Sequence, residues 1–294
     1  MTVVKLDEII RQDIEELLSV GEISAAVKLA PVMKSKLNSV EGFSAKGLPQ
    51  YFTGNRKGKT VMVNLNPGMD AKVSDDNWIA KKGDFNGYSV DSFFEYLQDQ
   101  YINFGLYDKD PDFPTKLRYD EFDVKQAAFL TPWKDSGINL PNNLDWSDRD
   151  ACLEAKTRAI CDKYQLELVP YASSKFAINP NEIHLFRPYM QTLLYEIFSE
   201  EREYVIFASA IFERIFEDYN KAYPGTFDLS RLTAVGETFK PDGKLRGKCK
   251  VITITYQGKT QKALIAHTFA SQALCRAFSL MQKYGQFCYS EFVK

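Results

Sequence analysis

The sequence predicts an α/β fold built on a largely parallel sheet, with a helical segment in front of it. Short runs of apolar, β-branched residues recur along the chain, segments with helical periodicity separate them, and polar turn residues follow several of the runs. Strands that alternate with helices over residues 60–284 favour a parallel sheet, because parallel neighbours need a crossover connection between them. The 294 residues, of which 45% are hydrophobic, are enough for a sizeable core.

Residues 1–48 are predicted to be an N-terminal helical extension, and residues 49–294 the α/β domain. Five apolar residues recur at helical spacing before Gly21, a residue that commonly ends helices. They are Ile9, Ile10, Ile14, Leu17 and Leu18. A second helix begins at Ser24 and must end near Pro31. We expect the extension either to dock on the domain or to act as a dimerisation arm, and we favour docking.

The first strand of the domain is predicted at Thr60–Val63, a continuous apolar run that suits a buried strand. Residues 53–60 in front of it resemble a phosphate-binding P-loop. They have three residues rather than four between Gly54 and Gly58, and they precede a strand instead of following one. We therefore interpret them as a polar turn.

The rest of the chain follows the same pattern of strands and helices. Further strands are predicted at 126–130, 166–171, 203–208, 251–256 and 262–266, and helices at 92–104, 148–164, 187–198, 209–219 and 270–284. Residues 229–265 are predicted to form a small β region. Residues 69–88 form a long polar loop, and loops of this length inside a domain are often functional.

Composition and charge exclude several classes of protein. The net charge of −2 argues against dense, non-specific coating of nucleic acid, and no stretch approaches the 18 apolar residues of a membrane span. The N-terminus lacks the apolar core of a signal peptide, and the five cysteines form no Cys-x-x-Cys pair. We expect a cytoplasmic protein without a membrane partner. We expect neither a metal nor another cofactor, because the two histidines lie far apart in the sequence.

Polar turns follow three of the predicted strands, and ligands of α/β sheets bind at the carboxyl ends of strands. These turns are NLNPG at 64–68, LTPWK at 130–134 and AHTFAS at 266–271. In the first turn Pro67 cannot donate to a sheet and Gly68 permits backbone angles closed to other residues, so the strand must end there.

On these turns the chain resembles the uracil-DNA glycosylase superfamily, in which Gly-x-Asn-Pro-Gly ends the first strand. Asn64 stands where the family has Gly. In the middle motif Thr131 takes the place of the family's Asn and Lys134 that of its Lys. The final motif keeps His267 and Ser271 of His-Pro-Ser-Pro-x-Ser but lacks both prolines. The resemblance implies a three-layer sandwich with a central, mostly parallel sheet.

It also implies an enzyme that hydrolyses the N-glycosidic bond of a deaminated or damaged base in DNA, after the base has left the stack. By this resemblance Asn66 and His267 would be catalytic: Asn66 would hold the attacking water, and His267 would face the charged base or the sugar. Thr131 would lie at the base edge, although a hydroxyl cannot reproduce the donor–acceptor pair of an amide. The remaining substrate-binding candidates are Asn64, Pro67, Gly68, Phe85, Tyr88, Lys134 and Ser271, with Phe85 or Tyr88 supplying a stacking ring.

Other interpretations of the same residues remain open. Asn66 could instead cap its own turn, and His267 could simply bond nearby backbone. The chain would then be a non-catalytic protein that binds a nucleobase, a nucleotide or nucleic acid on the same fold, or a helper protein whose aromatic residues are only core.

A basic stretch bears on the expected partner, which is DNA, single-stranded or damaged, or a small nucleobase or nucleotide. Residues 236–262 contain seven basic residues against Glu237 and Asp242. The basic residues are Lys240, Lys244, Arg246, Lys248, Lys250, Lys259 and Lys262. On a hairpin they would form either a positive ridge for nucleic acid or a solvated surface whose lysines protect a sheet edge.

Overall fold

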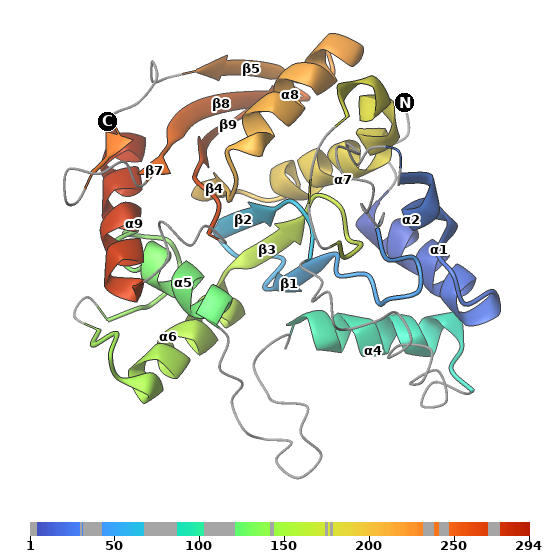
Figure 1. Cartoon of the computed structure of the whole chain (residues 1–294), viewed down its shortest axis with the longest axis horizontal. Coiled ribbons are helices and arrows are strands. Elements are labelled where there is room, and N and C mark those ends of the chain that lie inside the picture. The colour runs from blue at the N-terminus through green and yellow to red at the C-terminus, as the bar shows by residue number, and fades with distance from the viewer. Residues whose placement is uncertain are drawn as a thin grey trace, which may run out of the picture.

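The computed structural model confirms an α/β fold with a mixed, mostly parallel sheet (Figure 1). The structure describes residues 5–29, 31, 43–67, 87–102, 121–141, 144–173, 176, 179–231, 238–240, 247–269 and 277–294. Within these residues, no helix is long and apolar enough to cross a membrane.

The main sheet has seven strands within the described residues, in the order β1-β3-β2-β4-β9-β8-β5. The strands are β1 (Phe52–Gly54), β2 (Thr60–Asn64), β3 (Tyr164–Glu167), β4 (Tyr204–Phe207), β5 (Asp228–Arg231), β8 (Lys250–Tyr256) and β9 (Lys259–Ile265). The neighbours β3, β2, β4 and β9 are parallel, whereas β1 and β8 run antiparallel to their partners and β5 runs antiparallel to β8. Two short strands, β6 (Thr238–Phe239) and β7 (Gly247–Lys248), pair separately.

Helices cover both faces of this sheet, so the domain has three layers (Figure 1). One face packs against α1 (Leu6–Ser19), α2 (Ser24–Leu29), α4 (Val90–Ile102), the 3₁₀ helix η3 (Pro180–Phe186), α7 (Arg187–Phe198) and α8 (Ile211–Ala222). The other packs against α5 (Glu121–Leu130), α6 (Arg149–Asp162) and α9 (Phe278–Val293). Alternate residues of β2 divide between the two cores: Val61 and Val63 enter the first, and Met62 the second.

The N-terminal helix is part of the first core. Leu6, Ile10 and Ile14 of α1 are buried in the same cluster as the sheet residues. The buried carboxylate of Asp13 accepts hydrogen bonds from the hydroxyls of Tyr51 and Tyr171. These contacts fasten α1 to the segment in front of β1 and to the segment behind β3.

Most predicted elements appear close to their predicted positions, and α7 spans the predicted residues. The strand predicted at 126–130 is wrong, because these residues form the second half of α5. This short run is apolar apart from Gln126 and cannot be assigned by periodicity, because both its faces are buried. The predicted β region at 229–265 extends the main sheet through β5, β8 and β9. The closing helix is described from Phe278 to Val293, and residues 270–276 lie outside the described part of the chain.

Candidate functional site

The four parallel strands end at one edge of the sheet, which we call the carboxyl edge. β2 ends there at Asn64, and Asn66 follows it; β9 ends at Ile265, shortly before His267. β4 lies between these two strands. The strand ends that carry Asn66 and His267 are therefore two strand spacings apart, about 10 Å.

The side chain of Asn66 is held in one orientation by the fold. Its Nδ2 lies within hydrogen-bond distance of the carbonyl oxygens of Pro67 (2.9 Å) and Tyr171 (3.2 Å) and of the Ser173 Oγ (2.8 Å). Carbonyl oxygens only accept, so the amide nitrogen, not the oxygen, must face them. Among the described residues, no group donates to the Asn66 Oδ1, and this acceptor is left for another group.

Backbone hydrogen bonds hold the two loops together at this point. The Leu168 and Val169 amides donate to the carbonyl oxygens of Asn64 and Leu65 (2.9 Å each), and the Ser173 amide donates to that of Pro67 (3.2 Å). The chain that leaves β2 is thus paired with the chain that leaves β3, and the position of Asn66 depends on both.

A buried polar chain runs along β3 on the side that faces α5 and α6. The Glu167 Oε1 accepts hydrogen bonds from the Asn64 Nδ2 and the Gln165 Nε2, both at 3.0 Å. The Gln165 Oε1 accepts in turn from the Lys163 Nζ (2.9 Å), which also donates to the Gln126 Oε1. All five side chains are buried. This series of hydrogen-bonded side chains connects the interior of the sheet to Asn64 at the carboxyl edge.

Burial shifts the pKa values of the two ionisable groups in this hydrogen-bonded series, Glu167 and Lys163, toward neutral pH. It raises the pKa of the Glu167 carboxyl to about 7, although hydrogen bonds from Asn64 and Gln165 and the Lys163 charge act in the opposite direction. It lowers the pKa of the Lys163 ammonium to about 8, against the attraction of Asp123 and Glu167. A carboxyl group that titrates near neutral pH can both accept and donate a proton.

The structure also fixes the backbone of His267. Its amide donates to the Tyr284 hydroxyl (2.7 Å), which donates to the carbonyl oxygen of Lys248 (2.6 Å), so α9 holds the end of β9. The His267 Nδ1 lies 3.3 Å from the carbonyl oxygen of Thr268, and the side chain is half-buried. The predicted backbone bond is therefore present, and it engages only one of the two ring nitrogens.

Thr131 and Lys134 do not lie at the carboxyl edge, contrary to the predicted strand end. They follow α5, and the Thr131 hydroxyl donates to the carbonyl oxygen of Ala127 within that helix (3.0 Å). The hydroxyl of Tyr204, the first residue of β4, donates to the carbonyl oxygen of Lys134 (2.5 Å). Both residues thus belong to the opposite, amino edge of the sheet. The strand between β2 and β9 is β4, and Ser209 is the polar residue that follows it.

Tyr88 lies just before α4, where its ring meets Phe93 and Tyr96 edge-on at centroid distances of 5.9 and 6.1 Å. Its side chain is 38% exposed. Three other candidates, Gly68, Phe85 and Ser271, lie outside the described residues.

The described part of the basic stretch is largely engaged by the fold. The Lys250 ammonium pairs with Glu213, and the Lys259 Nζ donates to the carbonyl oxygen of Phe198 (3.1 Å). The Lys262 Nζ lies 4.9 Å from the centroid of the Phe292 ring. These contacts favour a hairpin surface over a free positive ridge. Lys244 and Arg246 lie outside the described residues.

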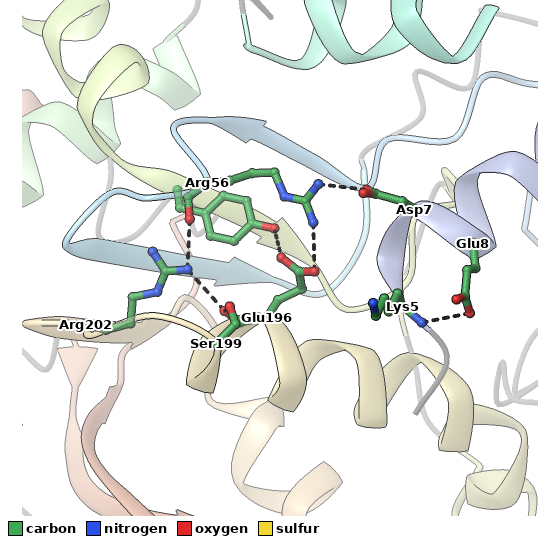
Figure 2. Close-up of polar contacts among 8 residues, drawn as sticks. Lys5, Asp7, Glu8, Arg56, Glu196, Ser199 and Arg202 are labelled. Atoms are coloured by element: carbon green, nitrogen blue, oxygen red, sulfur yellow. Dashed lines mark hydrogen bonds and ion pairs between the residues drawn. The ribbon is translucent and has the colours of Figure 1, made fainter. Parts of the chain in front are cut away.

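A second polar cluster lies near the amino edge, around Arg56 (Figure 2). The Arg56 guanidinium bridges Asp7 of α1 (2.7 Å) and Glu196 of α7 (2.9 Å), and the Tyr164 hydroxyl donates to the other Glu196 oxygen (2.8 Å). Arg202 donates to the carbonyl oxygens of Gly58 (2.6 Å) and Glu196 (3.1 Å). These groups bond one another, although the buried Arg202 Nε has no partner among the described residues. We interpret the cluster as a structural tie between α1, the turn after β1 and α7.

Sequence reasoning missed Glu167, Gln165, Lys163 and Ser209. The available signal was the alternation of Lys163, Gln165 and Glu167, since a central parallel strand is normally apolar on both faces. No group of three or more potential metal ligands occurs within the described residues. In the comparisons with known proteins, no family model, curated protein or solved structure matches this chain.

Proposed function

We propose that the chain binds a nucleobase at the carboxyl edge and hydrolyses its N-glycosidic bond in deaminated or damaged DNA, in the manner of a uracil-DNA glycosylase. The observation that carries the proposal is the fixed amide of Asn66. Its nitrogen is held by the loop after β3, and its oxygen is left as an acceptor at the strand end nearest to where a ligand of such a sheet would bind.

In the proposed reaction the Asn66 Oδ1 accepts a hydrogen bond from a water molecule and directs its oxygen at the sugar. The bond between the sugar carbon and the base nitrogen breaks, its electron pair leaves with the base, and the water oxygen bonds to the sugar carbon. His267, on the same edge, offers a ring nitrogen that stabilises negative charge on the departing base. The proton released by the water passes to the base or to solvent.

The test is cleavage of single- and double-stranded oligonucleotides that contain uracil or hypoxanthine. We expect abasic product from the wild type, and a loss of at least about 100-fold in Asn66→Ala and His267→Ala, which is the usual effect of removing one preorganised polar group. Lys134→Ala is the control, because this exposed residue lies at the amino edge and its loss should leave the rate unchanged.

Equal loss in Lys134→Ala would contradict the site, and full activity in both edge variants would contradict the roles of Asn66 and His267. If the wild type cleaves no substrate but binds the oligonucleotides, the non-catalytic binding function replaces the enzyme. One observation favours that second candidate. The polar residue that follows β4, the strand between β2 and β9, is Ser209, and a hydroxyl lacks the donor–acceptor pair with which an amide reads a base. This hydroxyl also accepts from the Ile211 amide (3.3 Å).

A further inference from the structure

The hydrogen bond between Asn64 and Glu167 decides which atom of the Asn64 amide is free. The Glu167 carboxylate, when ionised, can only accept, so the Asn64 Nδ2 must face it, at 3.0 Å. The Asn64 Oδ1, on the other side of the same carbon, receives no hydrogen bond from the described residues. Asn64 is 8% exposed and is the last residue of β2, at the carboxyl edge.

Glu167 is itself held by groups that leave it little freedom. Gln165 donates to the same Oε1, and Lys163 fixes Gln165 from the interior. The Oε2 of Glu167 is buried and has no hydrogen-bond partner among the described residues. Two charged groups interact electrostatically with the Glu167 carboxyl: Lys163, in front of β3, and Asp123, on α5. A purely structural carboxyl would be expected to satisfy both of its oxygens, whereas this one is fixed on the side that faces Asn64.

We propose that Glu167 is a positioning residue that locks the Asn64 amide with its oxygen toward the ligand, so that the carboxyl edge selects a nucleobase with a ring N–H donor. This inference rests on the proposed function and deepens it, because it assigns the chemistry of base recognition to Asn64 instead of Thr131. Asn64 and Asn66 then present two acceptor oxygens, one for the base and one for the water. A base without the N–H would leave the Asn64 oxygen unpaired on binding, which is unfavourable.

The first test needs no ligand and follows the side-chain amide signals of Asn64 by NMR during a pH titration, with Asn64→Ala to assign them. We expect these signals to titrate with a midpoint near pH 7 in the wild type and to lose this titration in Glu167→Gln. Signals that do not respond to pH in the wild type would contradict the coupling of Asn64 to Glu167.

The second test compares oligonucleotides that contain uracil or 3-methyluracil, in which a methyl group replaces the ring N–H. We expect the wild type to bind or cleave the uracil substrate at least about tenfold better. Glu167→Met, which keeps the length of the side chain but accepts no such bond, should reduce this ratio to within about threefold. Glu167→Gln retains an acceptor oxygen and should keep most of the ratio, which separates positioning from a general loss of folding.

The outcomes distinguish this inference from the proposed function. If Asn66→Ala abolishes cleavage of uracil while the ratio is the same in the wild type and in Glu167→Met, the positioning role is overturned and the proposed function stands. If the wild type acts on neither substrate and binds neither, the proposed function fails and base selection fails with it. The NMR titration then reports the Asn64–Glu167 contact alone.

Discussion

The buried carboxyl of Glu167 makes the stability of the protein depend on pH. Burial raises the pKa of this group from 4.5 to about 7, so the folded protein binds its proton more tightly than the unfolded chain does. The contribution of the Glu167 proton to the free energy of unfolding is complete below pH 4.5 and is lost as the pH rises through about 7. The difference between the two pKa values corresponds to roughly 3 kcal/mol.

We therefore expect the free energy of unfolding of the wild type, relative to Glu167→Gln, to fall by roughly 2–3 kcal/mol between pH 5 and pH 8. Urea denaturation of both proteins at the two pH values measures this difference. Burial also raises the pKa of Asp13, to about 6, but Asp13 is present in both proteins and cancels. Equal pH dependence in the two proteins would show that Glu167 titrates normally.

The Arg56 cluster contains two carboxylates that bond the same guanidinium but differ in burial. The Glu196 side chain is 6% exposed and that of Asp7 is 47% exposed. Glu196→Ala should cost roughly 2–3 kcal/mol, because it leaves Arg56 without its buried partner and the Tyr164 hydroxyl without its acceptor. Asp7→Ala should cost less than about 1 kcal/mol, because water screens the pair. Chemical denaturation measures both values, and equal costs would contradict the dependence on burial.

At the scale of elements, the contact of α5 with α9 requires a glycine. A Cβ atom at Gly285 would lie 2.0 Å from the carbonyl oxygen of Phe129, a backbone atom that cannot move without shifting α5. Gly285→Ala should therefore destabilise the protein by about 2 kcal/mol, although alanine favours helices. Ser279→Ala, at an exposed position of the same helix, should stay within about 0.5 kcal/mol. A stabilised Gly285→Ala variant would contradict this packing.

Helices whose first residues carry the usual start and capping signals could be predicted from the sequence. α7 has Pro188 in its first turn, where proline is tolerated, and Asp148 caps α6 through its bond from the Asp150 amide (2.9 Å). The second half of α5 could not be identified as helical, because residues 126–130 are all buried and show no polar face that would reveal the helical period. Because of this error, the sequence points to Thr131 for the polar turn between the ends of β2 and β9, whereas the polar residue there is Ser209.

The candidate site could be predicted in part. The end of β2 and the end of β9 follow from apolar runs that stop at polar turns, and the structure has both at one edge. Glu167 could not be identified as a site residue, because its importance depends on Asn64, which lies 103 residues earlier in the chain. Local sequence patterns do not show which residues so far apart in the chain come into contact.

At the scale of the whole molecule, α1 shares one core with the sheet, and the protein should unfold as one unit. Ile14 is 1% exposed, and Ile14→Ala should lower the stability of the whole domain by about 2–5 kcal/mol. Val20→Ala changes a residue that is 76% exposed and should stay within about 0.5 kcal/mol. Denaturation followed by both fluorescence and circular dichroism should give coincident transitions. A separate, earlier transition for α1 would show that the extension is independent.

The hydrogen bond between Asp13 and Tyr171 has a consequence for synthesis on the ribosome. The two residues are 158 positions apart, and a chain that grows at 5–20 residues per second takes roughly 8–30 s to make that segment. During this time the apolar face of α1 has been made but its partners on and behind β3 have not. The apolar face of α1 in a nascent chain therefore stays exposed until the segment behind β3 has been made, and the first helix reaches its final place only after that.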